Sequence, residues 1–293
     1  MDKKTDKKKY FVSSAPNLER LYIWSGVFFN TLASLLKVLC FSKKTSVNVS
    51  ESLCKDVVIL ANGPSLKDFL DQKRLFWESK DRLTVNHACK SPIFTEIRPQ
   101  YHVFADPAFF NDSGSSTTFD VIAQKVTWKF FVFVPFSAKK QPLWREKHKI
   151  LQQNPYIHVR FFNMTKVSGF DSFVNHCVKR GWGLPSPRNV LVPSIAHCLR
   201  MGYKNIYLAG ADHSWIKELW VNDNNEVMID DRHYYDSASS NVHQTAHLSL
   251  VLESIAIALN SYSDLERYAK CKNAKIYNIT PGSYIDVFER MKV

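Results

Sequence analysis

The chain has 293 residues, a formal net charge of +12 and six scattered cysteines without a CxxC pair. This length suffices for one large α/β domain, and the cysteine spacing excludes a disulfide-stapled scaffold, favouring reduced, mostly buried thiols in a cytoplasmic protein. The basic residues match no nucleic-acid-binding motif and are not interleaved with aromatic residues, so no nucleic acid is expected as a partner.

The first 50 residues carry nine Lys/Arg against three Asp/Glu and include an apolar stretch at Leu21–Phe41. That stretch is long enough to span a bilayer, but Asn30 and Lys37 interrupt it. Lysines on both flanks, with Tyr22 and Trp24 near one edge, favour a helix in or on the inner leaflet. Packing on the rest of the protein is the alternative. We expect a basic, membrane-associating segment at 1–50, a separate domain at 51–293 and a cytoplasmic protein held peripherally at the inner membrane.

Short apolar runs alternate with helical stretches over the rest of the chain. This alternation predicts an α/β fold of the Rossmann-like kind, with a mostly parallel sheet and helices on both faces. The expected strands are 57–61, 83–86, 101–105, 130–134, 157–162, 205–209 and 275–278. The expected helices are 66–77, 118–126, 143–152, 168–180, 190–201 and 243–260.

Residues 214–242 break this alternation between an expected strand and an expected helix. A long insertion at a strand end is often a lid over bound substrate. Its aromatic residues could supply the contact surface: Trp215, Trp220, Tyr234 and Tyr235.

The stretch Val57–Ser65 combines four apolar strand residues with a turn of Asn62, Gly63, Pro64 and Ser65, followed by an expected helix. A strand that ends in a tight turn and opens a helix directs backbone N–H groups toward a site where an anion can bind. The turn has neither the lysine of a P-loop nor the GxGxxG spacing. It therefore indicates a nucleotide held by backbone and small polar groups.

Three further expected strands also end in polar residues, and such ends meet at one edge of a parallel sheet. Each could be only a helix cap, but four together favour a shared nucleotide site. Besides the first turn, the candidate binding residues are Asn86, Asp106, Gly210, Asp212 and His213.

Histidines gather late in the chain, at 213, 233, 243 and 247. His243 and His247 are four apart at the start of an expected helix, so they would share a face. A metal site with Asp212 is one interpretation. The preferred interpretation is that one of these histidines is a general base.

The Asn62-Gly63-Pro64-Ser65-Leu66 motif, strands ending in Asn86 and in Asp106-Pro107, and the segment 199–212 resemble the bacterial sialyltransferases of glycosyltransferase family 42. The motif is shared with the wider MptE-like group. The resemblance covers roughly residues 56–285 and implies a metal-independent transferase that uses a CMP-linked sugar such as CMP-sialic acid. It implies that the first turn holds the nucleotide, Asn86 contacts the donor, His243 is the base, and Tyr234 or Tyr235 hydrogen-bonds the departing phosphate.

The resemblance also implies two partners, a nucleotide-sugar donor and a glycan or lipid-linked acceptor in surface polysaccharide or lipopolysaccharide synthesis. The sequence leaves open whether the protein forms an oligomer. Asp106 stands where those sialyltransferases usually have Asn, and Asp212-His213 replaces their aspartate and aromatic pair. These departures keep two alternatives open: an MptE-like, Mg²⁺-dependent diphosphate transferase using Asp106, and a non-catalytic assembly protein.

Overall fold

A computed structural model describes residues 16–45, 54–230 and 242–293. Its centre is an eight-stranded sheet in the order β13-β12-β8-β1-β2-β3-β4-β5, and every neighbouring pair is parallel. The predicted α/β fold is confirmed, and each of the seven expected strands lies in this sheet. The strands are β1 (Asp56–Leu60), β2 (Asp81–Val85), β3 (Tyr101–Val103), β4 (Phe130–Pro135), β5 (Ile157–Phe162), β8 (Asn205–Ala209), β12 (Lys275–Asn278) and β13 (Glu289–Arg290).

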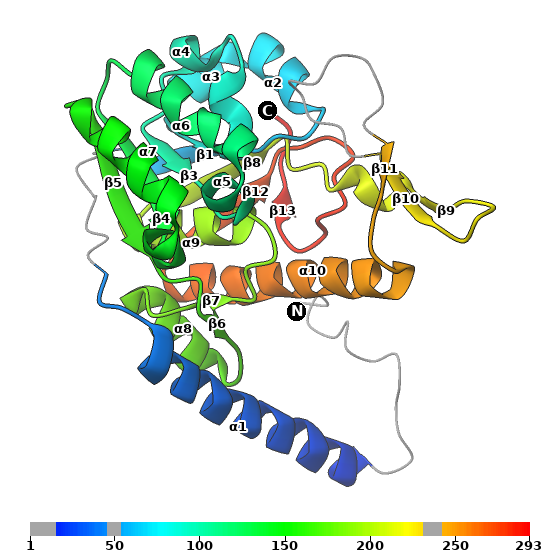
Figure 1. The fold of residues 1–293 in the computed structure, drawn as a ribbon. Coiled ribbons are helices and arrows are strands. Elements are labelled where there is room, and N and C mark those ends of the chain that lie inside the picture. Colours follow the sequence, from blue (N-terminus) through cyan, green and yellow to red (C-terminus); the bar gives the residue numbers. More distant parts are fainter. Residues whose placement is uncertain (1–15, 46–53, 231–241) are drawn as a thin grey trace.

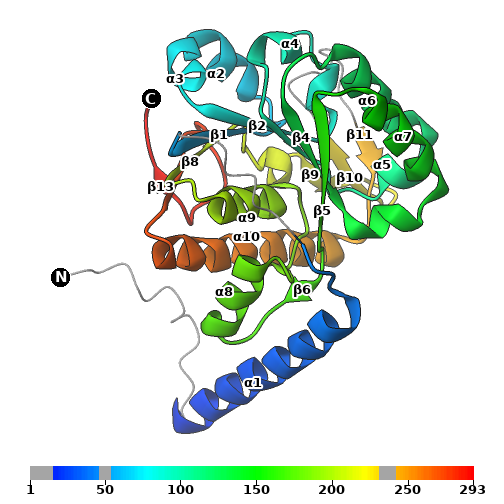
Figure 2. The same cartoon turned by 90° about the vertical axis from the view of Figure 1, so that its left-hand side faces the viewer.

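Helices cover both faces of the sheet, and α8 and α1 form an outer layer beyond α10 (Figure 1, Figure 2). The longer helices are α1 (Pro16–Phe41), α6 (Ser113–Lys125), α7 (Pro142–Gln153), α8 (Asp171–Arg180), α9 (Leu191–Met201) and α10 (Leu248–Cys271). The shorter ones are α2 (Leu66–Gln72), α3 (Arg74–Glu78), α4 (Phe94–Ile97), α5 (Ala108–Asn111) and the 3₁₀ helices η1 (Asn86–Lys90), η2 (Phe136–Lys140) and η3 (Ser214–Ile216).

The strands carry continuous apolar runs because both faces of the sheet are buried. In β1, Val57 and Ile59 face a core that includes α9 and α10, whereas Val58 and Leu60 face one that includes α2. All four side chains are at most 1% exposed. This two-sided core fixes the register of β1, whose carboxyl end opens into the site described below.

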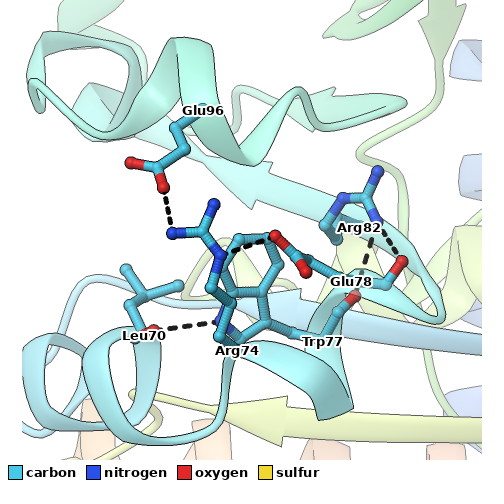
Figure 3. A network of polar contacts seen from close by, with 6 residues as sticks. All are labelled: Leu70, Arg74, Trp77, Glu78, Arg82 and Glu96. Carbon is cyan, nitrogen blue, oxygen red and sulfur yellow. Dashed lines mark hydrogen bonds and ion pairs between the residues drawn. The ribbon is translucent and has the colours of Figure 1, made fainter.

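A single helix was expected over 66–77, and this expectation is wrong. The chain breaks at Lys73 into α2 and α3, because the indole Nε1 of the buried Trp77 donates to the Leu70 carbonyl at 3.1 Å. Arg82 then donates to the carbonyl oxygens of Trp77 and Glu78, which lie at the end of α3 (Figure 3). The figure also shows Arg74 pairing with Glu78 and Glu96.

The helix expected from residue 243 begins only at Leu248, so that prediction is also wrong at its start. Within the insertion, β9 (Leu219–Val221), β10 (Val227–Asp230) and β11 (Val242–Gln244) form a small antiparallel sheet. His243 lies in β11 opposite Ile229, and strand pairing there overrides the helical pattern. His243 and His247 therefore do not share a helix face.

Helix α1 rests on the domain through one narrow stripe. The Oγ1 of Thr31 accepts the N–H of Phe170, and the Oγ of Ser34 accepts the N–H of Ser168, both at 2.9 Å. Gly169, at φ +128, allows this approach, because a Cβ there would lie 2.0 Å from Thr31 Oγ1. A two-stranded sheet of β6 (Lys166–Val167) and β7 (Leu184–Pro185) flanks the contact.

Candidate functional site

A pocket of about 820 Å³ lies at the carboxyl ends of the central strands. Chain order reverses between β1 and β8, and such a switch point is where open α/β sheets bind ligands. The ends of β1, β2, β3 and β8 all contribute to the lining, so the four polar strand ends singled out from the sequence surround one cavity. The predicted residues that line it are Asn62, Gly63, Pro64, Asn86, Asp106, Gly210, Asp212 and His213.

Gly63 and Asp212 join the ends of β1 and β8. The Gly63 N–H donates to the Gly210 carbonyl at 2.9 Å, and a Cβ on Gly63 would lie 2.0 Å from Asp212 Oδ2. Ser65 donates to the same carboxylate through Oγ at 2.8 Å and through its N–H at 3.3 Å. The donors of Ser65 therefore bind Asp212, and Ser65 is not among the pocket-lining residues.

Burial raises the pKa of the Asp212 carboxyl, and the hydrogen bonds from Ser65 lower it in part. Desolvation disfavours the charged form, whereas hydrogen bonds to the carboxylate favour it. The Asp212 carboxylate thus already accepts the hydrogen bonds that Ser65 offers in the turn after β1. An anion that bound at Ser65 would have to displace this carboxylate.

Two amide oxygens at the ends of β1 and β2 are buried without a hydrogen-bond partner among the described residues: Asn62 Oδ1 and Asn86 Oδ1. Asn62 is 9% exposed, and its Nδ2 donates to the Val85 carbonyl at 3.3 Å, which fixes the amide orientation. Both residues line the pocket. Because an unpaired buried acceptor costs about 1–3 kcal/mol, these oxygens are well placed to accept from ligand hydroxyl or amino groups.

Asn86 has a left-handed backbone, at φ +49. The fully buried His102 supports it, since its Nε2 lies 2.9 Å from the Asn86 carbonyl and its Nδ1 lies 2.8 Å from Thr84 Oγ1. Burial lowers the pKa of His102 to about 3, so the ring is neutral. The neutral His102 ring therefore holds the left-handed turn at Asn86 through its hydrogen bond to the Asn86 carbonyl.

A chain of hydrogen bonds that the sequence did not reveal runs along another wall. Asn189 Nδ2 donates to the Tyr262 hydroxyl at 2.9 Å, and that hydroxyl lies 2.7 Å from His213 Nε2. Asn189 Oδ1 accepts the N–H groups of Leu191 and Val192, which fixes the amide orientation. Because the Tyr262 hydroxyl accepts from Asn189, its own proton points to His213 Nε2. The neutral His213 ring therefore carries its proton on Nδ1.

Burial lowers the pKa of His213 to about 4, and its ring stacks on Trp215 with centroids 4.5 Å apart. Asn189 could have been found from its place just before an expected helix, where Asn caps the first turn. Nothing in the sequence indicated that Tyr262 belongs to the site, because it lies within α10, far along the chain from the other site residues.

Three charged side chains line the described part of the pocket: Asp106, Asp212 and Arg188. Asp106 is exposed, and its Oδ1 accepts the N–H of Ala108 at 2.8 Å. Arg188 is also exposed and forms none of the ion pairs found among the described residues. No group of three or more His, Cys, Asp or Glu residues in the described ranges could hold a metal ion.

Of the residues expected to carry the chemistry, the structure describes only His243, which lies away from the pocket lining. His243 is exposed on β11 and is not among the pocket-lining residues. Tyr234 and Tyr235, proposed from the sequence as lid residues, lie outside the described ranges. Of the other aromatic residues in the insertion, Trp215 lines the pocket and Trp220 is 41% exposed on β9.

The fold and pocket define a Rossmann-like α/β protein with a binding site at the switch point of its sheet. No protein-family model matches the chain. No curated protein matches it either. Among solved structures, the MAf glycosyltransferase from Magnetospirillum magneticum AMB-1 is similar, with 12% identity and a TM-score of 0.48. The match covers 92% of this chain and 38% of that one. At this level the activity of one chain is no evidence for that of the other.

Proposed function

We propose that this protein is a glycosyltransferase that binds a nucleotide-sugar donor, with CMP-sialic acid as the expected example, in the switch-point pocket. The main observation behind this proposal is that two amide oxygens at adjacent strand ends of that pocket, Asn62 Oδ1 and Asn86 Oδ1, have no hydrogen-bond partner among the described residues. Ribose hydroxyls and the amino group of a cytosine base are donors of the kind these acceptors need. A volume of about 820 Å³ is also sufficient for a nucleotide sugar.

The reaction would be a direct displacement at the anomeric carbon. An acceptor hydroxyl attacks that carbon, its proton passes to a base, and the nucleotide phosphate leaves with the electrons of the broken bond. Arg188 is the one Lys or Arg among the described lining residues, so it would stabilise the negative charge that develops on the leaving phosphate.

The proposed base remains His243. His213, which lines the pocket, is poorly suited, because its Nε2 accepts from Tyr262 and burial lowers its pKa to about 4. A base works best when its pKa is near the operating pH and its lone pair is available. Replacing His243 with Ala should lower turnover while nucleotide binding survives, and full turnover in that variant would refute the assignment.

The acceptor is proposed to be a glycan or lipid-linked sugar at the cytoplasmic face of the inner membrane. Residues 17–41 of α1 are long and apolar enough to cross a bilayer by composition, which is weak support by itself. The docked stripe is the stronger support: Ser34 and Val38 face the domain, while Leu32, Leu36 and Leu39 are 47%, 56% and 71% exposed. A helix with one docked face and one apolar exposed face suits a position in the membrane plane.

A metal-dependent diphosphate transferase is the second candidate, since Asp106 and Asp212 both line the pocket. Their arrangement does not suit Mg²⁺ binding, because Asp212 is held by Ser65 and no third acidic, His or Cys residue of the described ranges completes a group. Mg²⁺ usually requires octahedral oxygen ligation shared with phosphates. The proposed displacement therefore has no step that involves a metal.

The test is a thermal-shift comparison with CMP, CDP, UDP, GDP and ATP, each with and without Mg²⁺. Asn86→Gly keeps a residue that tolerates φ +49 and removes the side-chain amide, including its acceptor oxygen. We expect CMP or CDP to stabilise the wild type without metal and to stabilise this variant far less. Stabilisation by ATP with Mg²⁺ alone would favour the second candidate, and no nucleotide effect at all would favour a non-catalytic protein.

A further inference from the structure

A second cavity, of about 440 Å³, lies at the open edge of the sheet. Three separate segments line it: the chain that leaves α1, the 3₁₀ helix η2 and the edge strand β5. The two cavities share no lining residue, and η2 lies between them, with Ser137 and Ala138 on the first pocket and Phe136 and Lys139 on the second. We call this second cavity the edge cleft, and its lining residues are Lys44, Thr45, Phe136, Lys139, Val159, Arg160 and Phe161.

The edge cleft is lined by three cations and no acidic residue: Lys44, Lys139 and Arg160. None of the ion pairs among the described residues includes them. Besides burial, the positive charge of these side chains lowers the pKa of two nearby histidines. The pKa of His148 is lowered by burial and then by Lys139, and the pKa of His158 is lowered by burial and then by Arg160 and Lys129.

Aromatic rings hold two of these cations in place. Phe136 and Phe161 stack with centroids 5.6 Å apart, and the Nζ of Lys139 lies 4.1 Å from the Phe161 centroid. The guanidinium of Arg160 lies 5.5 Å from the centroid of Phe131. Cation–π contacts restrict the side chains without neutralising them, so the positive charges remain able to bind an anion.

The cleft also adjoins the helix proposed to lie in the membrane. Lys44 follows the last residue of α1 by three positions, and Leu39 and Phe41 near that end are 71% and 70% exposed. Both views show residues 42–45 leading from this end of α1 toward the end of β5 (Figure 1, Figure 2). A membrane surface that covered the exposed face of α1 would bring its phosphate groups toward this cleft.

We propose that the edge cleft is a phosphate-binding site. Two ammonium groups supply compact charge, and the guanidinium supplies paired donors that match phosphate oxygens. The phosphate could belong to the headgroup of an anionic lipid or to a soluble phosphate ester. The site is separate from the nucleotide pocket, so this proposal stands whether or not the proposed glycosyl transfer is correct.

The test compares the full-length wild type with a triple variant, Lys44→Gln, Lys139→Gln and Arg160→Gln. A matched control, Lys67→Gln, Lys90→Gln and Lys292→Gln, removes the same charge from exposed positions. Lys67 lies in α2, on the side away from α1 (Figure 1), and Lys90 is the last residue of η1. Binding is measured by co-sedimentation with phosphatidylcholine vesicles, alone or with phosphatidylglycerol, and with fatty-acid vesicles of equal charge. Inorganic phosphate and glycerol 3-phosphate are tested by thermal shift.

We expect the cleft variant to lose binding to phosphatidylglycerol vesicles by on the order of 100-fold, since each cation near the surface contributes about fivefold. The control should stay within about threefold of wild type. That result supports a lipid source. Stabilisation of wild type by the soluble phosphates that is lost only in the cleft variant supports a soluble source.

Equal losses in both triple variants would overturn the proposal, because binding would then follow net charge. Equal affinity for fatty-acid and phosphatidylglycerol vesicles would also overturn it. So would a cleft variant that changes neither assay, which would leave the charges as protection of the edge strand. Stabilisation of each variant by CMP or CDP reports on the nucleotide pocket separately.

Discussion

Gly63 and Asp212 are in contact across the switch point of the sheet: a Cβ on Gly63 would lie 2.0 Å from Asp212 Oδ2 and 2.6 Å from the Gly210 carbonyl oxygen. Only a residue without a side chain lets the turn after β1 close on the end of β8. The same contact places Asn62 and Asp212 in the lining of one pocket. The glycine is therefore required for the shape of the site.

Gly63→Ala should lower the free energy of unfolding by about 1–3 kcal/mol, because the added methyl overpacks a junction that includes backbone. Adding Asp212→Ala should recover only part of this loss, since the Gly210 carbonyl still obstructs the methyl. Urea denaturation measures both. Gly26→Ala is the control, because nothing lies within 4 Å of its Cβ position and helical Gly→Ala changes are favourable. Equal effects of the two glycine substitutions would contradict this explanation.

His213 should stay neutral well below the pH at which an ordinary histidine titrates. Burial lowers its pKa from 6.5 to about 4, so its neutral form stabilises the fold above pH 6.5, and this contribution is lost as pH falls toward 4. Nitrogen NMR should show the proton on Nδ1 at pH 7 and no titration of this ring down to pH 5.5.

Tyr262→Phe is the companion variant for His213. It removes the donor to Nε2 and the acceptor for Asn189, so the fixed tautomer should be lost. The free energy of unfolding should fall by about 1–3 kcal/mol. A wild-type His213 that titrates near pH 6.5 would refute the burial of this ring, and an unchanged tautomer in Tyr262→Phe would refute the hydrogen-bond assignment.

Two buried histidines should respond in opposite ways to replacement by leucine. His197 has both ring nitrogens buried without a hydrogen-bond partner and stacks on Phe133 at 4.5 Å. His197→Leu should raise the free energy of unfolding by about 1 kcal/mol, because a desolvated polar group is removed. His102→Leu should lower it by about 1–3 kcal/mol, because Thr84 and the Asn86 carbonyl lose a partner. Urea denaturation measures the unfolding free energy of both variants. A change in the same direction for the two variants would contradict the prediction.

Substitutions on the exposed face of α1 should affect membrane binding, and substitutions on its docked face should affect stability. Leu32→Gln with Leu36→Gln changes exposed positions, so it should weaken binding to phosphatidylcholine vesicles and leave the unfolding free energy nearly unchanged. Ser34→Val removes the acceptor for the Ser168 N–H. It should lower stability by about 1–3 kcal/mol and leave vesicle binding intact. Vesicle binding that does not respond to the leucine changes would argue against an apolar membrane face.

The sequence by itself determined seven of the eight strands of the central sheet, their parallel arrangement and the four polar strand ends. It did not predict β13 or the strands of the two small sheets. Continuous apolar runs such as 130–134 leave few alternatives to a strand buried on both faces, and the carboxyl ends of parallel strands meet at one edge. The boundary errors have a local cause. Trp77 binds the Leu70 carbonyl and ends the first helix early, and pairing with Ile229 draws His243 into a strand. Helical periodicity contains neither interaction.

Only the tertiary structure decided how the site residues divide their roles. Ser65 and Asp212 are 147 positions apart, and Tyr262 is 49 positions from His213, so no local pattern could show that they bind each other. Among the described residues that line the pocket, Asn62 and Asn86 are left with buried polar atoms that have no partner. The edge cleft has the same origin: Lys44, Lys139 and Arg160 are unremarkable lysine and arginine positions in sequence, and they acquire a common function only where α1, η2 and β5 meet. Hydrogen bonds and charge fields act between groups that are close in space, and that closeness is set by the packing of the whole chain.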